Sequence, residues 1–553
     1  MESFKLFSID IQKTKNSWPV SQIHKYSDYL ALIILNFLTH YLFIGYFKFV
    51  SDDWSQIVYS DISIHSLHHL FFESQRTGQF VLTKIVVSIF GETAFGYHLM
   101  NFFTTTLLLL LVYTIFKDLL KHLFNNPKAV AFLGAVLFCL LFNKDELYSW
   151  ATMFYDNLAY LLYFSSFYLF INSKKNSYNF YLSLVCYAGA VFIYEIGIFL
   201  PVLYCIFALM NKQNWKNTLY FLIPPAVYLI IRITNWFGYG WMYIDRTQNF
   251  LAISFISSGL DKYLHNLIAS VGITIINPVF SVLGLAKLNW YILIALLIIN
   301  LIISWILVKY FINPLGKKEI PEYNLKKYLN LAYFCFICIL VIYIPISVHG
   351  IIQPRYLLFV DFFVVLLVIL IAAPVIFGWK SSAIILIMLF TICLMINQGL
   401  YVNSIVSGEM QDSVNKAVFS HADEISASQY FYINSSDFFQ RNPNYVFNIK
   451  SDFSIVVNQH SKEVYYPYLN TEGLARWSAS AMMEGARINQ SSTLLIYGDE
   501  GSVFVEDNSS SLVYKNTMTG QQYRINKSEC FEGNSSNLLL DFDKQMKANW
   551  LFR

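Results

Sequence analysis

Two adjacent carboxylates, Asp52 and Asp53, follow the first long apolar run of the chain and stand beside Trp54. Neighbouring carboxylates repel each other, and this repulsion favours proton uptake by one of them, which suits it to act as a general base. The pair lies where the chain would leave a lipid bilayer. The alternative interpretation is that Asp52 or Asp53 only caps the helix that follows.

Residues 55–77 alternate between an apolar and a polar face at helical spacing. This pattern predicts an amphipathic helix that lies along the membrane surface. His65, His68 and His69 on its polar face have a spacing that could bind zinc. Clustered imidazoles also form a plain interfacial polar face, and we predict no metal and no other cofactor.

The elements that must position these residues follow from an apolar composition. Of the 553 residues, 56% are hydrophobic, 18% are aromatic and only 13% are charged, which indicates that lipid is the main solvent of the chain. The formal net charge of +3 is too small to predict a nucleic-acid partner. Six of the seven Cys lie in apolar stretches, so Cys530 has no disulfide partner in the polar tail.

The apolar runs predict an α-helical polytopic membrane protein with about eleven transmembrane helices. The first run, Tyr29–Val50, starts too late and is too long for a cleaved signal peptide, so it is interpreted as a retained signal anchor. The later runs cover 99–116, 129–143, 155–172, 178–193, 196–211, 217–233, 288–310, 328–348, 355–378 and 382–401.

Basic residues gather in alternate loops, at 117–128, 174–175, 212–216 and 309–327. By the positive-inside rule these loops and the N-terminal segment 1–28 face the cytoplasm. The alternation then requires 234–287 to stay outside, with its apolar part 264–285 re-entrant or interfacial. The outward-facing segments are 51–98, 143–154, the turn at 194–195, 234–287, 349–354 and the tail from 402.

The chain therefore divides into a transmembrane domain over 29–401 and an extracytoplasmic C-terminal domain over 402–553. The tail is richer in Asn, Ser, Asp and Glu than the rest of the chain. Strand-like runs at Tyr445–Ile449, Ser454–Val457, Thr493–Tyr497 and Ser502–Val505 and a helix-like run over Glu472–Arg487 predict a small α/β domain.

Several short motifs stand where apolar runs begin or end. They are Arg76-Thr77-Gly78-Gln79-Phe80, Phe90-Gly91-Glu92-Thr93-Ala94-Phe95-Gly96-Tyr97-His98-Leu99-Met100-Asn101, Tyr155-Asp156-Asn157-Leu158, Tyr194-Glu195 with Phe199-Leu200-Pro201, and Gln353-Pro354-Arg355-Tyr356. Together with the acidic pair, they resemble the GT-C glycosyltransferases. These are membrane enzymes with many helices that take a sugar from a polyprenyl-phosphate carrier, and the likeness covers roughly 30–400.

The resemblance implies an inverting, metal-independent hexose transfer to a glycan at the outer face of the membrane. It implies that Asp53, with Asp52 as second choice, removes the proton of the acceptor hydroxyl. A cation must then meet the charge that develops on the leaving phosphate. Arg355 is favoured because it matches the position of the family's cation, and the other candidates are Arg76, Lys84 and Arg232.

Further residues are candidates for substrate positioning. Glu195 and Asp156 are carboxylates at the ends of apolar runs, where burial is costly unless they are paired or hydrated. Trp236 and Trp241 could stack on sugar faces, or could belong to an aromatic belt at the lipid headgroups. For the basic candidates, Arg355 included, the alternative is a snorkelling anchor at a helix end.

Length, residue usage and the tail without disulfides narrow the resemblance to the O-antigen glucosyltransferases that modify lipopolysaccharide at the bacterial inner membrane. The expected partners are a polyprenyl-phosphate sugar donor, a glycan acceptor and the bilayer. Two other functions stay open, a flippase or transporter of lipid-linked glycans and a non-enzymatic membrane scaffold. Transporters usually place charges at mid-membrane, whereas the polar residues here gather at one face.

Overall fold

The computed structural model describes residues 18–49, 53, 76–91, 93–124, 126–173, 177–211, 213–239, 278, 281–282, 284–312, 325–348, 354–378, 382–420, 430–434, 494–496, 502–507, 511–516, 522–526 and 530–533. Side chains are described for a subset of these residues that excludes Arg232, Trp236 and Arg355. Asp52, Trp241 and the predicted amphipathic helix up to residue 75 lie outside the described residues.

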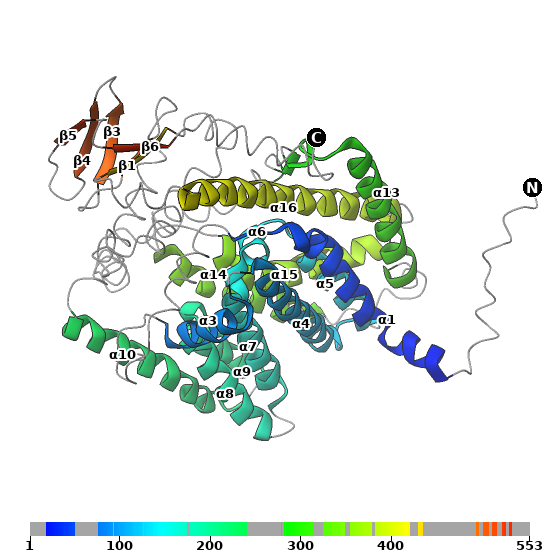
Figure 1. Ribbon diagram of the computed structural model, residues 1–553. Coiled ribbons are helices and arrows are strands. Elements are labelled where there is room, and N and C mark those ends of the chain that lie inside the picture. The colour runs from blue at the N-terminus through cyan, green and yellow to red at the C-terminus, as the bar shows by residue number, and fades with distance from the viewer. Residues whose placement is uncertain are drawn as a thin grey trace, which may run out of the picture.

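Helices make up nearly all of the described chain up to residue 420 (Figure 1). The α-helices are α1 Trp18–Asn36, α3 Thr77–Phe90, α4 Ala94–Leu120, α5 Pro127–Leu140, α6 Asp145–Ser149, α7 Phe154–Ile171, α8 Ser177–Ile193, α9 Leu200–Met210, α10 Ile223–Tyr239, α13 Trp290–Ile306, α14 Leu325–Val348, α15 Leu358–Gly378 and α16 Ser382–Ser420. Shorter 3-10 segments cover Ile44–Tyr46, Ala151–Met153, Glu195–Gly197, Trp215–Leu222 and Pro354–Leu357, and π-helical turns cover Phe37–Tyr41 and Leu307–Ile312.

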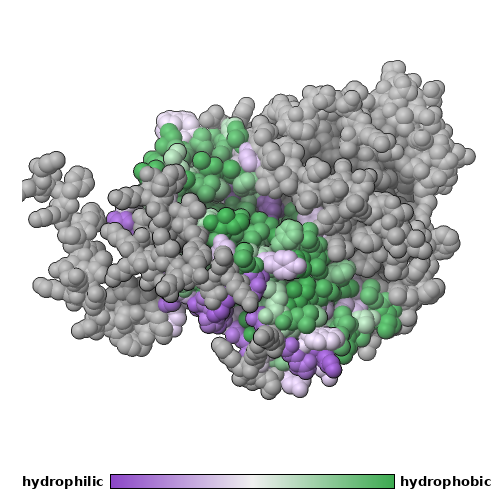
Figure 2. All heavy atoms as spheres, turned by 180° about the vertical axis from the view of Figure 1, so that it is seen from behind, coloured by the Kyte–Doolittle hydropathy of each residue, from purple (hydrophilic) through white to green (hydrophobic). Residues whose placement is uncertain are grey.

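Four helical stretches of the described chain are long and apolar enough to cross a membrane, namely Tyr26–Tyr46, Ala94–Leu120, Trp290–Ile312 and Ser382–Val406. Shorter apolar helices accompany them, and the coloured surface in Figure 2 is largely apolar. The structure therefore agrees with the predicted helical membrane protein. The number of about eleven crossings stays a prediction.

Aromatic side chains fill the interior between α4, α7, α9 and α15. The rings of Phe116 and Phe362 stack with centroids 4.8 Å apart, and those of Phe170 and Tyr204 stack at 4.7 Å. Gly134 on α5 lets this core close, because a Cβ there would lie 2.8 Å from Ile369 Cδ1. Close contact of this kind fixes the helix ends that carry the polar motifs.

The two ends of α4 carry different chemistry. Its first turns hold His98 and Asn101, whereas Lys117 and Lys121 lie at its other end, where Asp118 contacts Lys121. Asn101 and Lys117 are 16 residues apart in one helix, which corresponds to about 24 Å along its axis. The motif residues and the basic loop after α4 therefore lie at opposite ends of this helix.

Apart from 264–285, each predicted apolar run coincides with helical structure, although the bounds shift by several residues, and the few described residues of 264–285 are helical too. Almost all of 264–285 lies outside the described residues. The largest difference is α16, which continues to Ser420 rather than ending near residue 401. Helix α3 falls in the first outer loop, 51–98, for which amphipathic helices are predicted, but its bounds are not separately predicted from the sequence.

The strands described after residue 429 form two three-stranded sheets. They are β1 Tyr430–Asn434, β2 Leu494–Ile496, β3 Ser502–Asp507, β4 Ser511–Asn516, β5 Gln522–Asn526 and β6 Cys530–Gly533. In one sheet β1 runs antiparallel to β2 and parallel to β6, and in the other β4 pairs antiparallel with β3 and β5. β2 and β3 fall where strands were predicted; the runs at 445–449 and 454–457 and the helix at 472–487 lie outside the described residues, so the α/β domain stays a prediction.

Candidate functional site

Asp53 is fully buried, and its carboxylate binds the segment between α6 and α7. Oδ1 accepts a hydrogen bond from the backbone N–H of Thr152 at 2.8 Å and another from its hydroxyl at 2.6 Å. Oδ2 accepts from the backbone N–H of Ala151 at 3.1 Å. Asp53 thus acts as a cap for the 3-10 turn Ala151–Met153, which lies about a hundred residues further along the chain.

Two buried Asn side chains hold the same segment from the side of α4 and α7. The Asn101 amide donates to the carbonyl oxygens of Trp150 at 2.8 Å and Ala151 at 3.3 Å. The Asn157 amide donates to Asn101 Oδ1 at 3.0 Å and to the carbonyl oxygen of Leu147 at 2.7 Å. The motif that ends at Asn101 and the motif around Asp156 therefore meet at the segment that Asp53 binds.

Aromatic packing brings the chain from α1 to this point. The ring of Phe49 lies 5.2 Å from that of Tyr97, and the ring of Phe47 lies 4.8 Å from that of His98. The Tyr97 hydroxyl donates to the carbonyl oxygen of Gly91 at 2.8 Å, and Gly91 has a φ of +56° that few other residues tolerate. Gly91 and Tyr97 thus shape the turn between α3 and α4, and His98 packs against the segment that follows α1.

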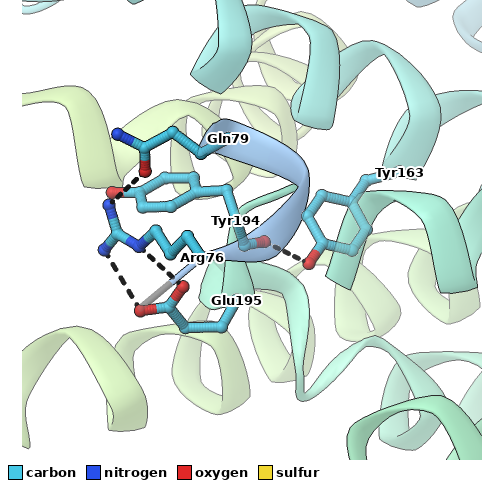
Figure 3. Close-up of polar contacts among 5 residues, drawn as sticks. All are labelled: Arg76, Gln79, Tyr163, Tyr194 and Glu195. Carbon is cyan, nitrogen blue, oxygen red and sulfur yellow. Dashed lines mark hydrogen bonds and ion pairs between the residues drawn. The ribbon is translucent and has the colours of Figure 1, made fainter. Parts of the chain in front are cut away.

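Arg76, at the start of α3, forms a two-bond ion pair with Glu195 (Figure 3). Its Nε lies 2.9 Å from Oε2 and its Nη2 lies 3.1 Å from Oε1, while Nη1 donates to Gln79 Oε1 at 3.3 Å. The guanidinium carbon lies 4.6 Å from the centre of the Tyr194 ring. Burial of the guanidinium opposes its charge, but Glu195, with smaller contributions from Tyr194 and Asp156, outweighs burial and raises the pKa of Arg76 well above its ordinary value.

The ion pair depends on a close approach between α3 and the end of α8. A Cβ on Gly78 would lie 2.8 Å from both the Phe192 carbonyl oxygen and Ile193 Cγ1, so only Gly lets α3 lie this close. On the other side the Tyr163 hydroxyl donates to the Tyr194 carbonyl oxygen at 2.5 Å (Figure 3). Arg76 is therefore positioned by backbone packing as well as by its own bonds.

The segment that carries Arg355 joins the same region. Its 3-10 turn, Pro354–Leu357, packs against α6, which ends just before the residues that Asp53 binds. The ring of Tyr356 lies 6.4 Å from the ring of Tyr194. The backbone of Arg355 thus lies between the segment bound by Asp53 and the segment paired with Arg76.

The structure brings some of the predicted site residues together and separates others. One region, at the ends of α3, α7 and α8, contains four of the predicted side chains and the backbone of a fifth residue. The side chains are those of Asp53, Arg76, Asp156 and Glu195, and the backbone is that of Arg355. Lys84 lies eight residues beyond Arg76, about 12 Å further along α3. Arg232 and Trp236 lie on α10, which packs against α8 and the 3-10 segment before it.

Sequence reasoning missed a buried polar group between α1, α5, α6 and α15. Asn143 donates to Asp361 Oδ1 at 2.9 Å, and the neighbouring Lys144 is fully buried with its ammonium donating to the Phe138 carbonyl oxygen at 2.6 Å. Burial lowers the pKa of Lys144 to about 8, although Asp361 partly opposes this shift. The sequence feature that could have indicated this group is a charged residue at or within an apolar run: Lys144 is next to one such run and Asp361 is inside another.

His40 extends this group toward α16. Its ring stacks on that of Tyr148 at 3.9 Å, its Nδ1 lies 2.8 Å from the Tyr401 hydroxyl, and its Nε2 lies 2.9 Å from the Cys139 carbonyl oxygen. His40 belongs to the π-helical turn Phe37–Tyr41 in the first apolar run. Within the part of the chain that the structure describes, no cluster of three or more His, Cys, Asp or Glu could hold a metal ion.

No protein-family model, curated protein or solved structure matches this chain. The fold defines a mostly helical protein with apolar helices of membrane-spanning length. Its candidate site is defined by the convergence of acidic, basic and amide side chains at the ends of those helices.

Proposed function

We propose that the protein is an inverting glycosyltransferase that moves a hexose from a polyprenyl-phosphate carrier to a glycan at the outer, non-cytoplasmic face of the membrane. The observation that carries this proposal is the convergence of five separate motifs. These motifs come from distant parts of the chain and meet at one set of helix ends. They are represented by Asp53 after the first apolar run, the ion pair of Arg76 with Glu195, Asp156, and the segment that contains Arg355. A bundle that needed only to pack would not have to gather charges there.

The reaction requires a base and a cation on opposite sides of one sugar carbon. The acceptor hydroxyl oxygen forms a bond to the anomeric carbon while its proton passes to a carboxylate of the acidic pair at residues 52–53. The bond between the anomeric carbon and the phosphate oxygen breaks, and its electron pair leaves with the polyprenyl phosphate. Attack from the face opposite the phosphate inverts the configuration, and a guanidinium stabilises the charge on the leaving group.

Arg76 has a geometry suited to that second task. Glu195 occupies the guanidinium edge formed by Nε and Nη2, and Gln79 contacts Nη1 at 3.3 Å, a long hydrogen bond. The edge formed by Nη1 and Nη2 has further N–H groups that can bind two phosphate oxygens. Arg76 and Arg355 together would then hold the phosphate, with Glu195 keeping Arg76 in place.

The proposed topology puts this chemistry outside the cytoplasm. The site lies at the end of α4 away from Lys117 and Lys121, and the positive-inside rule assigns those lysines to the cytoplasm. A polyprenyl-phosphate donor would then enter from the bilayer between the apolar helices, with the C-terminal α/β domain near the acceptor. Glucose and an O-antigen acceptor at a bacterial inner membrane are the narrower form of the proposal.

The direct test is sugar transfer in membranes that contain the full chain. Radiolabelled polyprenyl-phosphate glucose and O-antigen lipopolysaccharide are the substrates, with other hexoses tested in parallel. The double variant Asp52→Asn/Asp53→Asn should lose at least about a hundredfold of the rate, because it removes both candidate bases. Asp118→Asn, at the far end of α4, is the matched control and should retain the wild-type rate. The absence of transfer by the wild type with every hexose, or full transfer by the folded double variant, contradicts the proposal.

A transporter of lipid-linked glycans is the second candidate, and the buried group of His40, Lys144 and Asp361 favours it. Ionisable residues buried among apolar helices are characteristic of transport and proton pathways. Reconstitution in liposomes separates the two functions. Movement of a labelled lipid-linked glycan across the bilayer that stops in Asp361→Asn, without any sugar transfer, supports the transporter.

A further inference from the structure

We propose that Asp53 is a positioning residue for the 3-10 turn Ala151–Met153, and that another carboxylate takes the proton from the acceptor. This inference rests on the proposed function and divides the work of the acidic pair. It concerns the residue that the sequence alone favours as the base.

Both oxygens of the carboxylate are engaged by the protein itself. Three hydrogen bonds reach it from Ala151 and Thr152, at 3.1, 2.8 and 2.6 Å, and the side chain has no exposed surface. A general base must lie within hydrogen-bond reach of the proton that it removes. The three hydrogen bonds donated to the carboxylate stabilise its charged form, so proton uptake by Asp53 is disfavoured while it binds residues 151 and 152.

The bound turn is itself part of the site. It leads directly into α7, whose first turn holds Asp156, and it follows α6, against which the segment of Arg355 packs. Asn101 binds the carbonyl oxygens of Trp150 and Ala151 and Asn157 binds that of Leu147 in α6, while Asp53 binds N–H groups of the turn. The three side chains thus satisfy opposite ends of the peptide dipoles, and removal of Asp53 leaves buried N–H groups without their acceptor.

Kinetics as a function of pH test this assignment. We expect Asp53→Asn to lower kcat about tenfold and to leave the acidic limb of the pH–rate profile where it is in the wild type. Thr152→Ala should lower kcat by about fivefold, and the double variant should be no slower than Asp53→Asn, because both substitutions disrupt one contact. Asp52→Asn should abolish transfer. The proposal is overturned if Asp53→Asn lowers kcat more than about a hundredfold while Thr152→Ala keeps the wild-type rate. It is also overturned if Asp53→Asn removes or moves the acidic limb of the pH–rate profile.

Hydrogen exchange measures the anchor without any enzyme assay. In purified full-length protein, Asp53→Ala should speed amide exchange of a peptide covering residues 147–157 at least tenfold. Asp118→Asn should leave that peptide at its wild-type rate. Unchanged exchange in Asp53→Ala overturns the anchoring role. Faster exchange in Asp53→Ala, together with a wild-type protein that transfers no sugar, would uphold the anchor and refute the proposed function, so the two failures are distinguishable.

Discussion

The contact between Arg76 and Glu195 permits a quantitative prediction about stability. The two side chains are only 23% and 27% exposed and are joined by two charge-assisted hydrogen bonds at 2.9 and 3.1 Å. A hydrogen bond to a charged group contributes about 1.5–3 kcal/mol, and removal of one member of a buried pair costs about 3–5 kcal/mol. Because this pair is partly exposed, we expect each of Arg76→Met and Glu195→Met to cost about 2–3 kcal/mol.

The double variant Arg76→Met/Glu195→Met should cost less than the sum of the two single changes, because neither charge then remains without a partner. We expect a coupling of about 1.5 kcal/mol or more, measured by denaturant unfolding in detergent micelles. The matched control is Asp118 with Lys121, whose nitrogen and oxygen lie 3.9 Å apart at side chains 21% and 36% exposed. That surface pair should couple by less than about 1 kcal/mol. Additive costs for Arg76 and Glu195 would show that the guanidinium is not held by this carboxylate.

Three further predictions follow from other contacts. Burial lowers the pKa of Lys144 to about 8 from its ordinary 10.5, so at this position the unfolded chain binds more protons between these pH values, and Lys144 should contribute about 3 kcal/mol of added stability from pH 8 to 10.5. The measurement is the difference in unfolding free energy between wild type and Lys144→Met, which should change by this amount over that pH range, and a difference that is independent of pH would exclude Lys144 as the source. Asn101→Ala and Asn157→Ala should each cost about 1–3 kcal/mol in denaturant unfolding, with a double variant that costs less than their sum, whereas strict additivity would argue against a shared network. Gly78→Val should displace α3 from the end of α8 and reduce sugar transfer at least tenfold, while Gly45→Ala, whose added Cβ meets nothing within 4 Å, should be silent in the same assay.

The helices were largely accessible from the sequence, because a long apolar run specifies burial in lipid or in a helical core whatever its partners are. The motifs around Asn101, Asp156, Glu195 and Arg355 were also recognisable, since polar residues at the ends of such runs are unusual. The contacts between these motifs could not be predicted from the sequence. Nothing in the local sequence of Asp53 indicates that its acceptor oxygens bind N–H groups of residues 151 and 152.

The same limit explains the missed features. Helix α3 is short and begins within a motif rich in polar residues, so its pattern did not separate it from the outer segment. The contact between Asn143 and Asp361 joins positions more than two hundred residues apart, and periodicity carries no information about such contacts. The predicted amphipathic helix at 55–77, the imidazoles at 65–69, Asp52 and Trp241 remain sequence predictions.

The π-helical turn Phe37–Tyr41 makes the length of the first apolar run critical. Such a turn contains one residue more than an α-helical turn, and every residue after it is rotated by about 100° relative to an unbroken α-helix. Gln398 donates to the Leu38 carbonyl oxygen at 3.1 Å and Tyr401 contacts His40, so two residues of α16 contact the widened turn directly. Deletion of a single residue there would replace the widened turn by a regular helical turn and so change the surface that Gln398 and Tyr401 contact. Insertion of a single residue would rotate the residues that follow by about a further 100°, so this stretch should be less tolerant of length changes than of apolar substitutions.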